Sequence, residues 1–91
     1  MDETQITWSD YMLYRMKERG YEAAKLEEII RHSAERYIDT DSGRTVIVGR
    51  HDELLVLIPV EMDGSTIVPI TVHATTRQQI RFRLQSGRFR V

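Results

Sequence analysis

The segment RTVIVGRHDELLVLIPVEMDGSTIVPITVH (residues 44–73) determines which class of fold this 91-residue chain adopts. Runs rich in Val, Ile and Leu alternate in it with short polar segments, a pattern that predicts antiparallel strands joined by turns. Together with RYID just upstream, the strands are expected over residues 36–39, 44–49, 54–61 and 66–73. Because consecutive strands usually pair, the simplest arrangement is a four-stranded meander.

The turns and prolines of this segment limit its strands. The predicted turn RHDE at residues 50–53 contains His51, which is expected to be exposed, and Asp63-Gly64 predicts a type I′ hairpin turn. Pro59 and Pro69 interrupt the last two strands. Because each lacks a backbone N–H donor, we expect them at bulges or on the free edge of a strand.

Two helices are predicted before the strands. Thr7 is expected to cap the first helix, with Ile6 packing on Tyr11 as a hydrophobic staple. Gly20 predicts the end of this helix, and apolar residues at helical spacing predict a second helix over about residues 22–32. The short link between the two predicts an αα-hairpin.

The C-terminal segment TTRQQIRFRLQSGRFRV (residues 75–91) allows two interpretations. Alternation of apolar residues with arginines over residues 80–84 is typical of a fifth strand with an arginine face. Ile80 and Leu84, however, are four residues apart, Thr75 or Thr76 offers an N-cap, and Gly87 offers a stop. We favour the helix.

These elements predict an α+β fold in which two N-terminal helices pack on a four-stranded antiparallel sheet and a short helix follows. A chain of 91 residues has room for a single domain, here assigned to residues 1–91. The sequence contains no cysteine, its acidic start does not look like a secretory signal, and its apolar runs are too short to span a bilayer. We therefore expect a cytoplasmic protein with no membrane contact.

Charge is distributed unevenly along the chain. The formal net charge is −1, yet all 14 Asp and Glu residues lie at or before Asp63, and the chain after it carries 5 Arg. A local positive potential attracts a polyanion even where the whole molecule is nearly neutral. The basic C-terminal segment is therefore the expected contact for RNA or for an acidic protein.

No glycine-rich phosphate loop, nucleophile elbow or zinc-protease motif is present in the sequence. Glu28 and His32 are one helical turn apart, but without a third ligand nearby they are expected to form a surface pair. We therefore predict no metal and no cofactor.

The residues that could carry chemistry follow the last strand. His73 lies close in sequence to Arg77 and Arg81, so it is a candidate acid or base for metal-independent RNA cleavage in which the arginines hold phosphate. The alternative is that His73 only ends a strand and the arginines only keep a helix soluble. Arginines interleaved with aromatic rings can grip phosphates and stack bases, and the predicted nucleic-acid-binding residues are Arg77, Arg81, Phe82, Arg83 and Arg88.

Residues 9–75 resemble a bacterial domain-of-unknown-function family related to the BrnT toxins, within the RelE/ParE toxin-like superfamily. The resemblance is carried by an R-M-x-x-R-G signature, here Arg15, Met16, Arg19 and Gly20, and by a strand reading I-T-V at residues 70–72. It implies a toxin of a type II toxin–antitoxin pair that acts as an endoribonuclease. RNA and an antitoxin protein are the partners implied, and a homo-oligomer is left open.

The arginines of the signature have a structural interpretation. Arg15 and Arg19 lie at i and i+4 of the first predicted helix and therefore face the same way. We expect them to clamp a carboxylate of the sheet, Asp39 or Asp41. The remaining hypothesis keeps the fold without catalysis, as a binding module that docks an acidic protein or nucleic acid.

Overall fold

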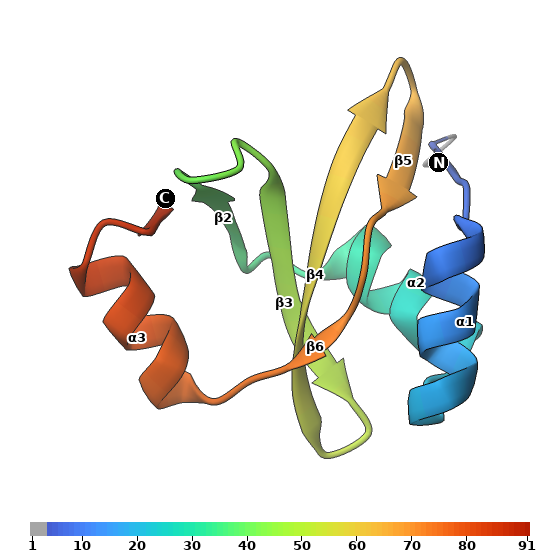
Figure 1. Ribbon diagram of the computed structural model, residues 1–91, viewed down its shortest axis with the longest axis horizontal. Helices are drawn as coiled ribbons and strands as arrows, with labels where there is room; N and C mark the ends of the chain where they lie inside the picture. The colour runs from blue at the N-terminus through green and yellow to red at the C-terminus, as the bar shows by residue number, and fades with distance from the viewer. Residues whose placement is uncertain (1–3) are drawn as a thin grey trace.

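Three layers of secondary structure form the protein in a computed structural model that describes residues 4–91. Figure 1 shows α1 and α2 together on one side of the strands and α3 alone on the other side. The predicted α+β class is confirmed. The helices are α1 Asp10–Arg19, α2 Ala23–His32 and α3 Arg77–Gln85.

The strands form a mixed sheet of seven rather than the predicted four. They are β1 Gln5–Ile6, β2 Arg36–Asp39, β3 Thr45–His51, β4 Leu54–Asp63, β5 Thr66–Pro69, β6 His73–Ala74 and β7 Phe89–Arg90. The sheet order is β1-β5-β4-β3-β2-β7, with β6 also paired to β4, and β1 runs parallel to β5. The three additional strands β1, β6 and β7 have two residues each, too short to leave a period in the sequence.

The predicted strand over residues 66–73 is in fact two strands. Pro69 pairs with Val60, whereas His73 pairs with Leu57, so the pairing with β4 is interrupted in between. Pro59 lies opposite this interruption, and its carbonyl accepts from the Ile70 N–H at 2.9 Å. In an antiparallel strand the N and O atoms of one residue point toward the same neighbouring strand. The N–H that Pro59 lacks would therefore point toward the break after β5, where the pairing is already interrupted.

Each face of the sheet has its own apolar cluster because strand residues alternate sides. Ile47 of β3 lies in the cluster beneath α1 and α2, with Met12, Leu26 and Ile30. Its neighbours Val46 and Val48 lie in the other cluster, which includes Ile80 of α3 and Phe89 of β7. This second face is covered by one short helix, and the uncovered part of it holds the candidate site.

The N-cap of α1 is Ser9, not Thr7. Ser9 Oγ accepts from the Met12 N–H at 3.1 Å, so the helix begins later than predicted. With Ser9 as the cap, Ile6 and Tyr11 do not occupy the N′ and N4 positions of the predicted staple, and Tyr11 is 55% exposed. Gly20, with φ of +73°, ends the helix as predicted.

The C-terminal segment is the helix that we favoured. Thr76 Oγ1 accepts from the Gln79 N–H at 3.1 Å, the N-cap contact that the sequence predicts. Ile80 is buried against the sheet and Leu84 is partly buried beside it.

Two turns differ from the sequence-based expectation. The β4–β5 turn is formed by Gly64 and Ser65, one residue later than predicted, and of these only Gly64 has a positive φ. A type I′ turn needs positive φ at both positions, so the geometry is that of type II′. The β3–β4 turn is shortened to two residues, with Asp52 at φ +56°.

His51, predicted to be exposed, is buried at 6% relative exposure. Its Nε2 accepts from the Glu22 backbone N–H at 2.9 Å, and its ring meets Tyr21 edge-on at 5.2 Å. It therefore binds one of the free amides at the start of α2 and fixes that helix to the sheet. No helix within residues 4–91 is long and apolar enough to cross a membrane.

Candidate functional site

A groove lies between α3 and the uncovered part of the sheet. Its volume is about 380 Å³, within the range of small-ligand sites. Its apolar lining consists of buried or partly buried residues of the strands and of the break after β5. They are Val46, Leu57, Pro59, Ile70 and Phe89. The polar lining residues are Asp39, Asp41, Ser42, Arg44, Thr71, His73, Arg83 and Arg88. We call this hollow the α3 groove.

Arg83 is held in the α3 groove by a column of rings. Tyr37 of β2 and Phe89 of β7 are stacked, with centroids 5.7 Å apart, and the Arg83 guanidinium lies 5.4 Å from the Phe89 centroid. The cation–π contact orients the guanidinium without neutralising it. Among the described residues, none forms an ion pair with Arg83.

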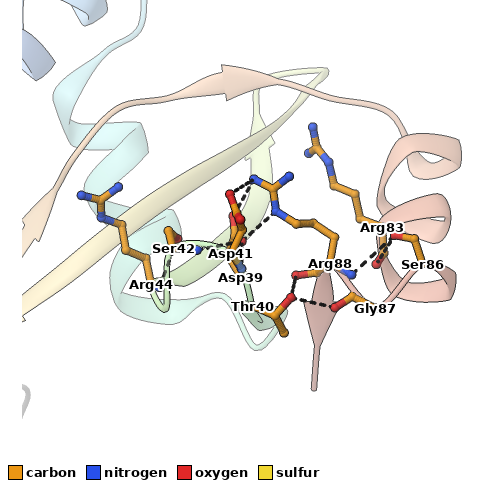
Figure 2. Close-up of polar contacts among 9 residues, drawn as sticks. All are labelled: Asp39, Thr40, Asp41, Ser42, Arg44, Arg83, Ser86, Gly87 and Arg88. Atoms are coloured by element: carbon orange, nitrogen blue, oxygen red, sulfur yellow. Dashed lines mark hydrogen bonds and ion pairs between the residues drawn. The ribbon is translucent and has the colours of Figure 1, made fainter.

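Arg88, in contrast, is already engaged. Its Nε and Nη2 donate to the two oxygens of Asp39 at 2.8 and 3.2 Å, and Asp41 lies 3.8 Å away. Figure 2 shows the Arg88 side chain reaching to the turn after β2, whereas no dashed line leaves the Arg83 guanidinium. Thr40 Oγ1 donates to the Gly87 carbonyl at 2.8 Å and so reinforces the same connection.

A second ion pair holds the other end of α3. Arg77 Nη1 donates to Glu35 Oε2 at 2.6 Å, and the Tyr37 hydroxyl donates to the same oxygen at 2.8 Å. Arg77 does not line the α3 groove. We refer to the Arg77–Glu35 and Arg88–Asp39 pairs as the α3 clamps, because they join the two ends of the helical segment to β2 and the residue before it.

His73 receives an arginine from the opposite layer. Arg15 of α1 contacts His73 Nδ1 through Nη2 at 3.3 Å and donates to the Val72 carbonyl through Nε at 3.4 Å. Burial lowers the pKa of His73, and the charges of Arg15, Arg83 and Arg19 lower it further. The imidazole is therefore neutral near pH 7.

This contact determines which imidazole nitrogen carries the proton. A guanidinium only donates, so Nδ1 must accept and the proton lies on Nε2. In this arrangement His73 presents a hydrogen-bond donor and has no nitrogen available as a base. The chemistry that the arrangement supports is the binding of an anion, not proton abstraction.

The structure separates the residues predicted for this site. His73, Arg83 and Arg88 meet in the α3 groove, whereas Arg77 is bound to Glu35 outside it. Arg81 is exposed and does not line the α3 groove. Phe82 lines a separate hollow on the outer face of α3.

The predicted clamp of Arg15 and Arg19 onto Asp39 or Asp41 is wrong. Asp39 is bound by Arg88, Arg19 lies 3.6 Å from Glu18, and Arg15 binds next to His73. Spacing within α1 could show that the two arginines share a face, but it could not show which distant strand lies opposite.

Sequence reasoning missed other parts of the α3 groove. Arg44 reaches it from the residue before β3 and pairs with Glu61 at 2.8 Å. Thr71 Oγ1 is buried in the break after β5 and has no hydrogen-bond partner among the described residues. Thr71 was expected in the I-T-V strand and Pro69 was expected to interrupt that strand, but no sequence spacing shows that Arg44 and Thr71 reach the same groove.

Acid should release the α3 clamps. The Arg77 guanidinium lowers the pKa of Glu35 below its ordinary 4.5, and Arg88 lowers the pKa of Asp39 below its ordinary 3.8. A lowered pKa contributes stability that is fully present above the ordinary value and is lost as pH falls through the folded-state value. Unfolding by urea between pH 7 and 2.5 should show the free energy of unfolding falling below about pH 4.5. The variants E35Q and D39N should each flatten this fall, and an unchanged fall in both would contradict the clamps.

Glu28 and His32 form a surface pair at 3.9 Å, as expected. Within residues 4–91 no group of three or more potential metal ligands is found. Comparison of the chain with protein-family models, curated proteins and solved structures finds no match.

Proposed function

We propose that the chain binds single-stranded RNA by its phosphates in the α3 groove. The observation that carries the proposal is that His73 and Arg83 both line the groove and that Arg15, although not a lining residue, contacts His73 at 3.3 Å. Neither arginine forms an ion pair with a residue of the described chain. Two unneutralised guanidiniums beside an imidazole N–H present donors only, the complement of a phosphate.

Charge supports a limited RNA contact. The chain after Asp63 contains no acid, whereas the part up to it carries 14 acidic against 8 basic residues and repels a polyanion. RNA would therefore contact mainly residues that follow Asp63 in the sequence, among them His73 and Arg83. Single strands suit a groove of this size, because their phosphates can follow a narrow path.

Backbone amide shifts during titration with a short single-stranded RNA would test this proposal. We expect the shifts to concentrate at residues 71–73 and 83–89, with little change in α2. Shifts that cluster on α2, or no shift at low salt, would overturn the proposal. In the second case an acidic protein should be sought as the occupant of the α3 groove.

Cleavage of the bound RNA is a second candidate function, favoured by the neutral state of His73. Cleavage would require Arg15 to leave Nδ1, so that this nitrogen can take the proton of a 2′-hydroxyl. The 2′-oxygen then attacks phosphorus to form a 2′,3′-cyclic phosphate, the bond to the 5′-oxygen breaks, and that oxygen takes a proton from water. H73Q should then abolish cleavage while retaining RNA binding. Intact RNA after long incubation with the unmodified protein would exclude this function.

Kinship with BrnT-type and RelE/ParE-type toxins is part of the proposal. Two N-terminal helices, strands β2 to β5 in antiparallel succession and a C-terminal helix support it. An antitoxin is the partner that this kinship proposes.

A further inference from the structure

A second hollow lies on the outer face of α3, beside the α3 groove. It has a volume of about 490 Å³ and is lined by Gln78, Gln79, Phe82, Arg83, Ser86 and Arg88. Phe82 is 68% exposed there, although a phenyl ring gains much from burial. Arg83 and Arg88 line both hollows, so the two sites adjoin.

Helical spacing places the Phe82 ring between the Gln78 amide and the Ser86 hydroxyl. Gln78, Phe82 and Ser86 are four residues apart in succession and share one stripe of the helical segment, next to the stripe of Gln79 and Arg83. Gln79 Oε1 accepts from the Thr75 hydroxyl at 3.1 Å, and its NH2 group makes no hydrogen bond to a described residue. The Gln78 amide makes no hydrogen bond to a described residue, so both its donor and its acceptor are open.

We propose that the outer hollow of α3 holds one base of the RNA strand, stacked on Phe82 with its edge bonded by the Gln78 and Gln79 amides. The inference rests on the proposed function, since it is the phosphate on Arg83 that brings the adjoining nucleotide to Phe82. Base–aromatic stacking tolerates any base, because each has a π face, and the two amides add a preference among base edges.

Charge complementarity favours this occupant. None of the residues lining the outer hollow is acidic, and Arg81 on the same helix is exposed without an ion pair in the described chain. An apolar protein surface would cover the Gln78 amide and the Arg83 guanidinium without partners, which is costly. A nucleotide can contact all of these groups at once, with its base on the Phe82 ring and the amides and its phosphate on Arg83.

The test compares two strands of equal length, an RNA octamer and its abasic counterpart, by fluorescence anisotropy at low salt. F82A should weaken binding of the octamer about fivefold or more and leave the abasic strand unchanged. F82W should bind the octamer at least as tightly as the unmodified protein. Y14A is the matched control, because Tyr14 of α1 is similarly exposed, at 60%, and should affect neither strand.

The outcomes separate the two proposals. If both strands bind the unmodified protein and F82A changes neither, the base site is wrong and the phosphate groove stands. If neither strand binds at low salt, both proposals fail together. A loss of affinity for the octamer alone supports the base site.

Discussion

Gly49→Ala is expected to lower the free energy of unfolding by about 1–3 kcal/mol, the usual cost of forcing an additional group into a packed core. A Cβ at position 49 would lie 2.6 Å from Cγ2, 2.9 Å from Cγ1 and 3.2 Å from Cβ of Ile29, so α2 must move away from β3. Small domains have little stability to lose, and the melting temperature should fall by about 4 °C or more. G49V should be more severe.

Urea denaturation of a double-mutant cycle with I29A provides the control. I29A removes the two nearest atoms of the clash, so adding G49A in that background should cost at least about 1 kcal/mol less than it does alone. Equal costs in both backgrounds would show that close packing of α2 on β3 is not what requires glycine here.

The second large effect separates two arginines of the same helix. Arg77 is neutralised by Glu35, whereas Arg83 lies free over Phe89. R83Q should therefore weaken RNA binding about tenfold or more, the value of one charge-assisted hydrogen bond, while R77Q should change it less than about twofold. Affinity is measured by anisotropy with one labelled strand at one salt concentration.

Stability provides the matching control. R77Q should lower the free energy of unfolding at pH 7 but not near pH 2.5, where Glu35 is protonated and the pair is already lost. R83Q removes no carboxylate partner, so the fall in the free energy of unfolding below about pH 4.5 that belongs to Glu35 should remain in this variant. Equal RNA affinities for R77Q and R83Q would contradict the division of roles.

Local signals were enough to predict the helices, the hairpins and the α+β class. The Thr76 cap and the Gly20 stop are each made within a few residues, so the sequence displays them directly. Strands β1 and β7 could not be predicted in the same way. They consist of two residues each, and distant partners hold them in place.

The candidate site was predictable in composition but not in arrangement. Five arginines without acids after Asp63 favoured an anion contact, and His73, the candidate acid or base, lies in the α3 groove with Arg83 and Arg88. Which arginines remain free depends on Glu35 and Asp39, some 40 to 50 positions away along the chain. Arg15 meets His73 across 58 positions, a contact for which sequence spacing gives no rule.

Salt dependence of RNA affinity tests the central claim most directly. Each phosphate of a single strand that a cation neutralises contributes about −0.7 to the slope of log affinity against log salt concentration, so contacts at Arg15 and Arg83 predict a slope of at least about −1.4. The slope measured for the double variant R15Q/R83Q should be shallower by about 1.4. The variant R50Q should keep the original slope, because Arg50 is exposed and lies outside the groove. Measurable binding with that loss of slope is the predicted result. No binding at low salt, or a slope that R15Q/R83Q leaves unchanged, would contradict a phosphate-binding α3 groove.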